Sequence, residues 1–151
     1  DAALEWATKL KNDSLLCTLY GALGEYAANI DADYYQAIQW IYKGIELAQV
    51  NRHKQQYGLL LSQLANTYYL KRDGNGLKYA LECYELGCEL QDNYLTYSGA
   101  IQSAYMYFLN KQHTQAMAYV QEAEVLMKQN NFYDQAHTFN LLGQLSDELG
   151  N

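Results

Sequence analysis

The fold is decided by residues 61–90, which read LSQLANTYYLKRDGNGLKYALECYELGCEL. In the first part, Leu61, Leu64 and Ala65 follow spacings of three and four, which place them on one face of an α-helix. The middle, residues 71–76, is polar and contains two glycines, as turns often do. The last part repeats helical spacing with Ala80, Tyr84, Gly87 and Leu90. The stretch therefore predicts a helical hairpin.

The pattern of the second helix in this hairpin occurs in three places along the chain. Each copy has an Ala, a large residue four positions later, a Gly or Ala three after that, and a Leu three further on. The small residue in the third place would let a neighbouring backbone come close. The copies are Ala37-Ile41-Gly44-Leu47, Ala80-Tyr84-Gly87-Leu90 and Ala116-Val120-Ala123-Leu126.

The pattern of the first helix also recurs, and it fixes the period of the repeat. A small residue recurs in this pattern at intervals of 41, 39 and 39 residues, at Gly24, Ala65, Ala104 and Gly143. A fixed period of about 40 residues indicates a stack of similar helical units, in which each unit packs mainly against its neighbours.

These paired patterns resemble the tetratricopeptide repeat across essentially the whole chain. The long period and the absence of proline depart from the usual repeat and resemble the long-period variants found in bacterial signalling regulators. The resemblance implies an all-α, right-handed α–α superhelix (a solenoid) of antiparallel helical hairpins in one domain, residues 1–151. We expect eight helices, at about 2–11, 14–29, 33–50, 53–71, 76–91, 94–110, 113–130 and 133–149.

Local signals at the links support these boundaries. Asp13-Ser14, Asp33 and Asp92-Asn93 can cap the helices that follow them. Asp73-Gly74-Asn75-Gly76 is the clearest turn, since Gly and Asn tolerate positive φ angles.

Both ends of the sequence resemble half of a hairpin. The opening Ala3-x-x-x-Ala7-x-x-Leu10 resembles a second helix, and residues 133–149 resemble a first helix without its partner. We therefore expect a fragment of a longer protein, or self-association through end helices. The apolar stripe expected to be exposed on the last helix includes Phe139, Leu142 and Leu145.

Composition excludes several classes of partner. Net charge is −7, and the bases are scattered, which argues against a nucleic-acid surface or an anionic membrane. No apolar stretch is long enough to insert into a membrane. The three cysteines, Cys17, Cys83 and Cys88, lie on apolar helical stretches, so we expect buried free thiols. Unpaired cysteines favour the reducing cytoplasm as the compartment, and the alternative is an extracytoplasmic fragment.

The sequence offers no constellation for catalysis, metal binding or a cofactor. The histidines His53, His113 and His137 are far apart, and no pair has the spacing of a helical zinc site. Glu82, Glu85 and Glu89 lie on one helical face, which we interpret as solvated because Glu is seldom buried. We therefore predict no enzymatic activity.

The resemblance implies that the first helices of successive repeats line a concave peptide-binding groove. Asn66 falls where the family often holds a ligand's peptide backbone, and Tyr69, Tyr105 and Phe108 would add aromatic area. Alternatively, Asn66 is merely exposed and the aromatic residues pack between repeats. The candidate groove residues are Ser62, Asn66, Tyr69, Ile101, Tyr105, Phe108, Asn140 and Gln144, and the same register includes Glu25, Asn29, Leu70, Ser98 and His137.

The groove register contains no base where carboxylate-clamping repeats carry Lys or Arg; Gly21, Ser62, Ile101 and Asn140 stand there instead. We therefore expect a protein or peptide partner that is neutral, apolar or basic. The predicted function is a non-catalytic interaction module. The alternative is a ligand-sensing regulatory domain of a larger bacterial signalling or transcriptional regulator.

Overall fold

The computed structural model describes residues 2–132 and 136–149, and its long elements are all α-helices. The prediction of an all-α fold with eight helices is confirmed for this part of the chain; residues 133–135, expected in the last helix, lie outside it. The helices are α1 (Ala2–Lys9), α2 (Asp13–Asn29), α3 (Tyr34–Val50), α4 (Lys54–Leu70), α5 (Leu77–Leu90), α6 (Asn93–Leu109), α7 (His113–Asn130) and α8 (Ala136–Leu149), with a short 3-10 turn, η1 (Gly74–Gly76), before α5.

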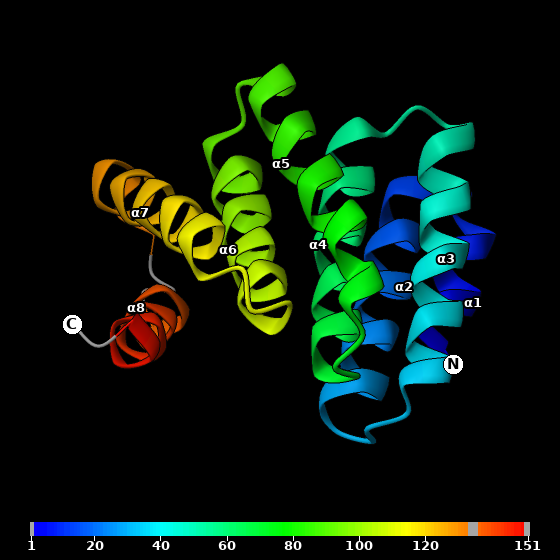
Figure 1. The fold of residues 1–151 in the computed structure, drawn as a ribbon. Coiled ribbons are helices and arrows are strands. Elements are labelled where there is room, and N and C mark those ends of the chain that lie inside the picture. Colours follow the sequence, from blue (N-terminus) through cyan, green and yellow to red (C-terminus); the bar gives the residue numbers. More distant parts are fainter. Residues whose placement is uncertain (1, 133–135, 150–151) are drawn as a thin grey trace.

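The helices follow one another across the molecule, with the first and last at opposite ends (Figure 1). Each helix packs against the next in sequence, and α4 also contacts α2 and α6, while α6 contacts α8. Within the described residues, α3, α5 and α7 do not contact one another in this way. The even-numbered helices therefore form an inner layer and the odd-numbered helices an outer one, the arrangement of a helical repeat.

The links between helices share one backbone feature. In each link a residue other than glycine has a positive φ, and in every link before α7 the next helix or 3-10 turn begins two residues later. The turn at 71–76 differs from the prediction in this respect, because the positive φ of 58° belongs to Arg72 and not to Gly74, Asn75 or Gly76. The positive-φ residues are Lys11, Ala32, Arg52, Arg72, Gln91, Lys111 and Asn131.

Side-chain caps begin several of the helices. Asp33 accepts a hydrogen bond from the backbone N–H of Gln36 at 3.0 Å, and Asp92 accepts one from Leu95 at 3.0 Å, as predicted. The cap of α2 is Asn12, one residue before the predicted Asp13. The Asn12 side chain accepts a hydrogen bond from the backbone N–H of Leu15 at 3.0 Å. Asp13 is instead the first helical residue, where a carboxylate favours the positive end of the helix dipole.

The small residues of the repeat pattern lie in the core. Ala37, Ala80 and Ala116 are fully buried, and so are the small residues at Ala65 and Ala104 of the inner helices. Gly143 differs from its counterparts, since it is exposed and a Cβ atom there would meet nothing within 4 Å. No described element covers that face of α8.

The ends of the array are only partly as expected. Leu145 is fully buried rather than exposed, because α8 packs it against the core of α6 and α7. Phe139 is exposed, as are Trp6 and Leu10 near the start of the chain, and the side chain of Leu142 lies outside the described residues. None of the described helices is both long and apolar enough to cross a bilayer.

Candidate binding groove of the inner layer

A groove of about 480 Å³ lies along the inner layer. All of its described lining residues come from the even-numbered helices, two from α2, two from α8 and the rest from α4 and α6. The regular stacking of the repeats thus brings side chains from distant parts of the sequence onto one surface.

The structure brings together seven of the eight predicted groove residues: Ser62, Asn66, Tyr69, Ile101, Tyr105, Asn140 and Gln144. Glu25, Asn29, Leu70 and Ser98 of the same register also line the groove. Phe108 does not, because it lies one turn beyond Tyr105 and faces adjoining hollows at the end of α6. The side chain of His137 lies outside the described residues.

The floor of the groove is formed by residues that also join α4 to α6. Ser62, Ile101 and Tyr105 are nearly buried, and the Ser62 hydroxyl lies 2.6 Å from the hydroxyl of Ser98. The rings of Tyr69 and Tyr105 pack with their centroids 4.7 Å apart. Tyr105 therefore packs between repeats, and Tyr69 presents the more accessible aromatic ring at this point.

The walls of the groove are rich in amide side chains. Gln63 and Gln102 line it in addition to the predicted Asn and Gln residues. They were not predicted from the sequence, because the tetratricopeptide register does not include their positions. The Oε1 atoms of Gln102 and Gln144 are buried and accept no hydrogen bond from the described residues. A buried acceptor without a donor is costly, so these atoms favour a bound molecule that supplies N–H or O–H groups.

Two further aromatic residues line the groove at the start of α6. Tyr94 and Tyr97 pack against Phe132, with ring centroids 5.6 Å and 5.2 Å from it. Sequence reasoning missed both tyrosines because they precede the register positions that the family uses. Their packing ties the end of α7 to the groove.

The groove is neutral to acidic. Glu25 is the only charged residue among its described lining residues. Asp147 and Glu148 line an adjoining hollow together with Gln144 and Phe108. This distribution of charge agrees with the absence of bases expected from the register.

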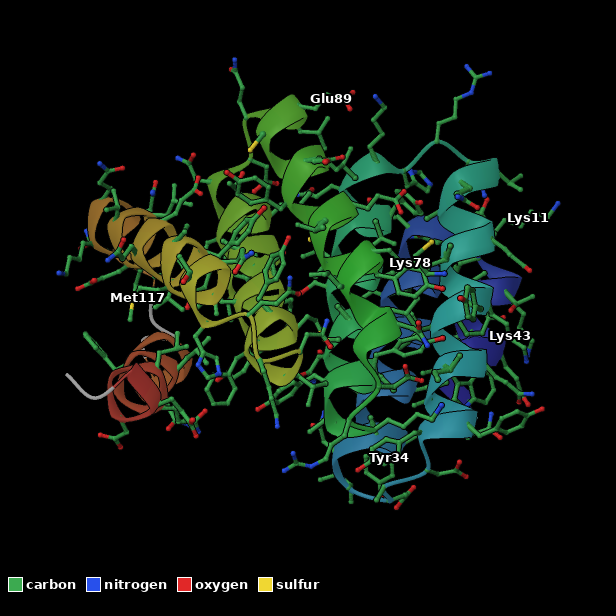
Figure 2. The ribbon with its side chains drawn as sticks, in the orientation of Figure 1. Lys11, Tyr34, Lys43, Lys78, Glu89 and Met117 are labelled. Atoms are coloured by element: carbon green, nitrogen blue, oxygen red, sulfur yellow. The ribbon has the colours of Figure 1, made fainter. Side chains whose placement is uncertain are left out.

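The remaining reactive groups lie apart from the groove. Cys17 and Cys83 are buried as predicted, but Cys88 is exposed because it lies on the outer face of α5. Glu82, Glu85 and Glu89 are exposed, and Glu89 near the upper end of α5 (Figure 2) pairs with Lys54 at 2.7 Å. Among the described residues, no three His, Cys, Asp or Glu side chains are placed to hold a metal ion.

Compared with models of known protein families and with curated proteins, the sequence matches none.

Proposed function

We propose that this chain is a non-catalytic, tetratricopeptide-like interaction module that binds a peptide or an extended protein segment along the inner layer. The observation that carries the proposal is the convergence of side chains from four successive even-numbered helices on one groove. Its volume of about 480 Å³ lies in the range of ligand sites.

The side chains of the groove suit a peptide main chain. An amide group both donates and accepts hydrogen bonds, as a peptide unit does, and Asn66, Gln63 and Gln102 offer such groups beside one another on α4 and α6. Tyr69 and Tyr94 add aromatic surface with a polar tip, which is common at protein interfaces.

The charges of the groove favour a neutral, apolar or basic ligand. No Lys or Arg is among the described lining residues of the groove. Glu25 lines the groove itself, and Asp147 and Glu148 line an adjoining hollow. The unpaired Oε1 atoms of Gln102 and Gln144 favour a ligand that presents hydrogen-bond donors. An acidic segment would present acceptors and meet like charge.

The test is a screen of a diverse peptide array with the wild-type protein and an Asn66→Ala, Gln102→Ala variant. We expect neutral or basic peptides with apolar residues to be selected, and their affinity to fall roughly 10-fold or more in the variant, since each lost hydrogen bond costs about 1 kcal/mol. The matched control is Gln39→Ala, Gln121→Ala, which removes two exposed amides from the outer helices α3 and α7.

Equal binding by the groove variant and the wild type would place the site elsewhere and overturn the proposal. The same holds if the control variant loses as much affinity as the groove variant. Circular dichroism and thermal unfolding of all three proteins would show that the substitutions leave the helices intact.

A further inference from the structure

A second hollow, of about 430 Å³, lies at the lower edge of the molecule. This edge carries the links that lead from even-numbered to odd-numbered helices (Figure 1), and Tyr34 marks the first of them (Figure 2). Among their described lining residues, this hollow and the groove have Tyr69 and Gln144 in common. The hollow also shares Phe108, Gln144 and Glu148 with the adjoining hollow that Asp147 lines. Its described lining residues are Tyr69, Arg72, Phe108, Leu109, Lys111, His113, Gln144 and Glu148.

The hollow is built from the same two positions in successive repeats. Tyr69 and Phe108 hold equivalent places one repeat apart, and so do Arg72 and Lys111. Each repeat thus contributes an aromatic residue and, three positions later, a base. The bases are equivalent in backbone as well, with φ angles of 58° and 59°.

A base is not needed to form such a link. Ala32 takes the corresponding place in the link between α2 and α3, with a φ of 51°. Bases near a helix C-terminus favour its dipole, but that effect does not require an aromatic ring beside each one. The pairing of ring and base is therefore a feature of this hollow and not of the link.

The two bases are available to a ligand. Arg72 and Lys111 are exposed, and neither forms an ion pair with a described residue. The neighbouring Lys71 differs, because its ammonium group lies 3.3 Å from the Asp73 carboxylate. Glu148 is the only acid among the described residues of the hollow.

The rings provide an apolar surface beside the positive charges. Phe108 stacks on His113 with a centroid distance of 5.5 Å and an interplanar angle of 26°. Tyr69 packs in turn on Tyr105, on the groove side. A ligand with a flat or aliphatic body could lie on these rings while its anionic end meets the bases.

We propose that this hollow binds a carboxylate carried on an aromatic or aliphatic body, as in a small free acid or in an acidic peptide side chain next to an apolar residue. This site differs from the groove in two ways. The hollow favours an anionic ligand, whereas the groove favours a neutral, apolar or basic one, and the hollow is formed in part by residues of the links.

The test is a nuclear magnetic resonance titration of the isotopically labelled protein with two pairs of probes. The first pair is 3-phenylpropionate and its neutral amide, 3-phenylpropionamide. The second is N-acetyl-Phe-Asp-amide and N-acetyl-Phe-Asn-amide. We expect binding of a charged probe to shift the backbone signals of Phe108, Lys111 and His113. We also expect the affinity for that probe to fall as salt is added.

An Arg72→Ala, Lys111→Ala variant is expected to bind the charged probe about 10-fold more weakly, since each exposed charge contributes a few-fold. The matched control is Lys43→Ala, Lys78→Ala, which removes two positive charges from the outer surface (Figure 2). These lysines lie over the rings of Trp40 and Tyr79, at 4.4 Å and 4.8 Å from the centroids. The control should bind the probe as the wild type does.

Binding by both charged probes would support a site for carboxylates in general, and binding by the peptide alone a site for acidic peptide segments. The proposal is overturned if neither charged probe binds, if the neutral amides bind equally well, or if both variants weaken binding alike. The Asn66→Ala, Gln102→Ala variant should keep this site, so failure here is distinguishable from failure of the groove.

Discussion

At the scale of single residues, two glycines decide how closely α5 and α6 pack. A Cβ atom at Gly99 would lie 2.3 Å from the backbone nitrogen of Tyr84, and one at Gly87 would lie 2.4 Å from that of Thr96. These distances leave no room for a methyl group, and the neighbouring atoms belong to the backbone, which yields little. Gly87, the small residue in the third place of the repeat pattern, therefore lies where the backbones of α5 and α6 are in contact.

Gly99→Ala is expected to lower the free energy of unfolding by about 2 kcal/mol or more, because the added methyl group forces the two helices apart. Chemical denaturation would measure the loss. Gly143→Ala is the control, since an added Cβ there meets nothing within 4 Å, and it should gain about 0.5–1 kcal/mol from better helix propensity. An unchanged stability of Gly99→Ala would contradict the close crossing of α5 and α6.

The three cysteines should differ in reactivity. Cys88 is exposed, whereas Cys17 and Cys83 are buried. Burial raises the pKa of both buried thiols, that of Cys83 to about 12, so their reactive thiolate forms are scarce near neutral pH. We expect a thiol reagent to modify Cys88 alone in the folded protein, and all three cysteines after unfolding, as mass spectrometry would show. Rapid modification of Cys83 under native conditions would contradict its place in the core.

At the scale of elements, the hairpins are held by tyrosine pairs that recur with the repeat. Tyr68 packs on Tyr79 with centroids 5.5 Å apart, and Tyr107 packs on Tyr119 at 5.6 Å. Both pairs join an inner helix to the outer helix that follows it. Much of the tyrosine excess of this chain therefore lies between helices, where the apolar ring is buried and the hydroxyl reaches polar neighbours.

The links offer a test of backbone strain. Ala32 is exposed and holds a φ of 51°, which costs a non-glycine residue roughly 1 kcal/mol. Ala32→Gly should relieve that cost and raise the free energy of unfolding by up to about 1 kcal/mol. Part of the gain is lost because glycine gives the unfolded chain more conformational freedom.

The control for this substitution is Ala22→Gly, at an exposed position inside α2. It should cost about 1 kcal/mol, because glycine is a poor helix former. Thermal or chemical denaturation would compare the two variants. If both substitutions destabilise the protein alike, Ala32 does not hold a left-handed conformation.

At the scale of the whole molecule, hydroxyl groups bridge helices of the outer layer whose backbones do not touch. The Tyr42 and Tyr79 hydroxyls lie 2.6 Å apart and join α3 to α5, and the Tyr84 hydroxyl donates to Glu122 at 2.7 Å and joins α5 to α7. Burial and these partners raise the pKa of Tyr79 and Tyr84. The outer layer is thus held together by groups that must stay protonated.

Stability should therefore fall in alkaline solution. Burial and a hydrogen bond to the Glu82 carboxylate raise the pKa of Tyr57 from 10.0 to about 12, and burial raises that of Cys83 from 9.0 to about 12. A raised pKa in the folded state contributes stability that is fully present below the unfolded pKa. That stability is lost as pH rises from about 9–10 to 12, with a slope of about 1.4 kcal/mol per pH unit for each proton.

Denaturation at a series of pH values would measure this slope. Tyr57→Phe should make it shallower above pH 10, since no proton can then be lost at residue 57. Tyr35→Phe, at a tyrosine that is 75% exposed, is the control and should leave the slope unchanged. Equal slopes for the Tyr57→Phe variant and the wild type would show that Tyr57 does not hold its proton more tightly in the folded state.

Local spacing predicted much of this fold. Helix periodicity, the regular recurrence of small residues on the inner helices and the caps at Asp33 and Asp92 follow from residue types and their order along the chain. The groove positions came from the resemblance to the tetratricopeptide repeat, and seven of the eight predicted residues line the groove. Equal positions in stacked repeats meet on one face, so the register carries over from one repeat to the next.

Other features of the molecule depend on distances between repeats, and these were visible in the three-dimensional structure alone. The order of residues along the chain places Tyr69 and Phe108 at equal positions of successive repeats. The packing of α6, however, turns Phe108 out of the groove and into the hollow that Arg72 and Lys111 line. The sequence also could not predict that the Oε1 atom of Gln102 is buried without a hydrogen-bond donor from the described residues. Whether a polar atom finds a partner depends on how neighbouring helices are spaced and tilted, and a repeat period fixes neither.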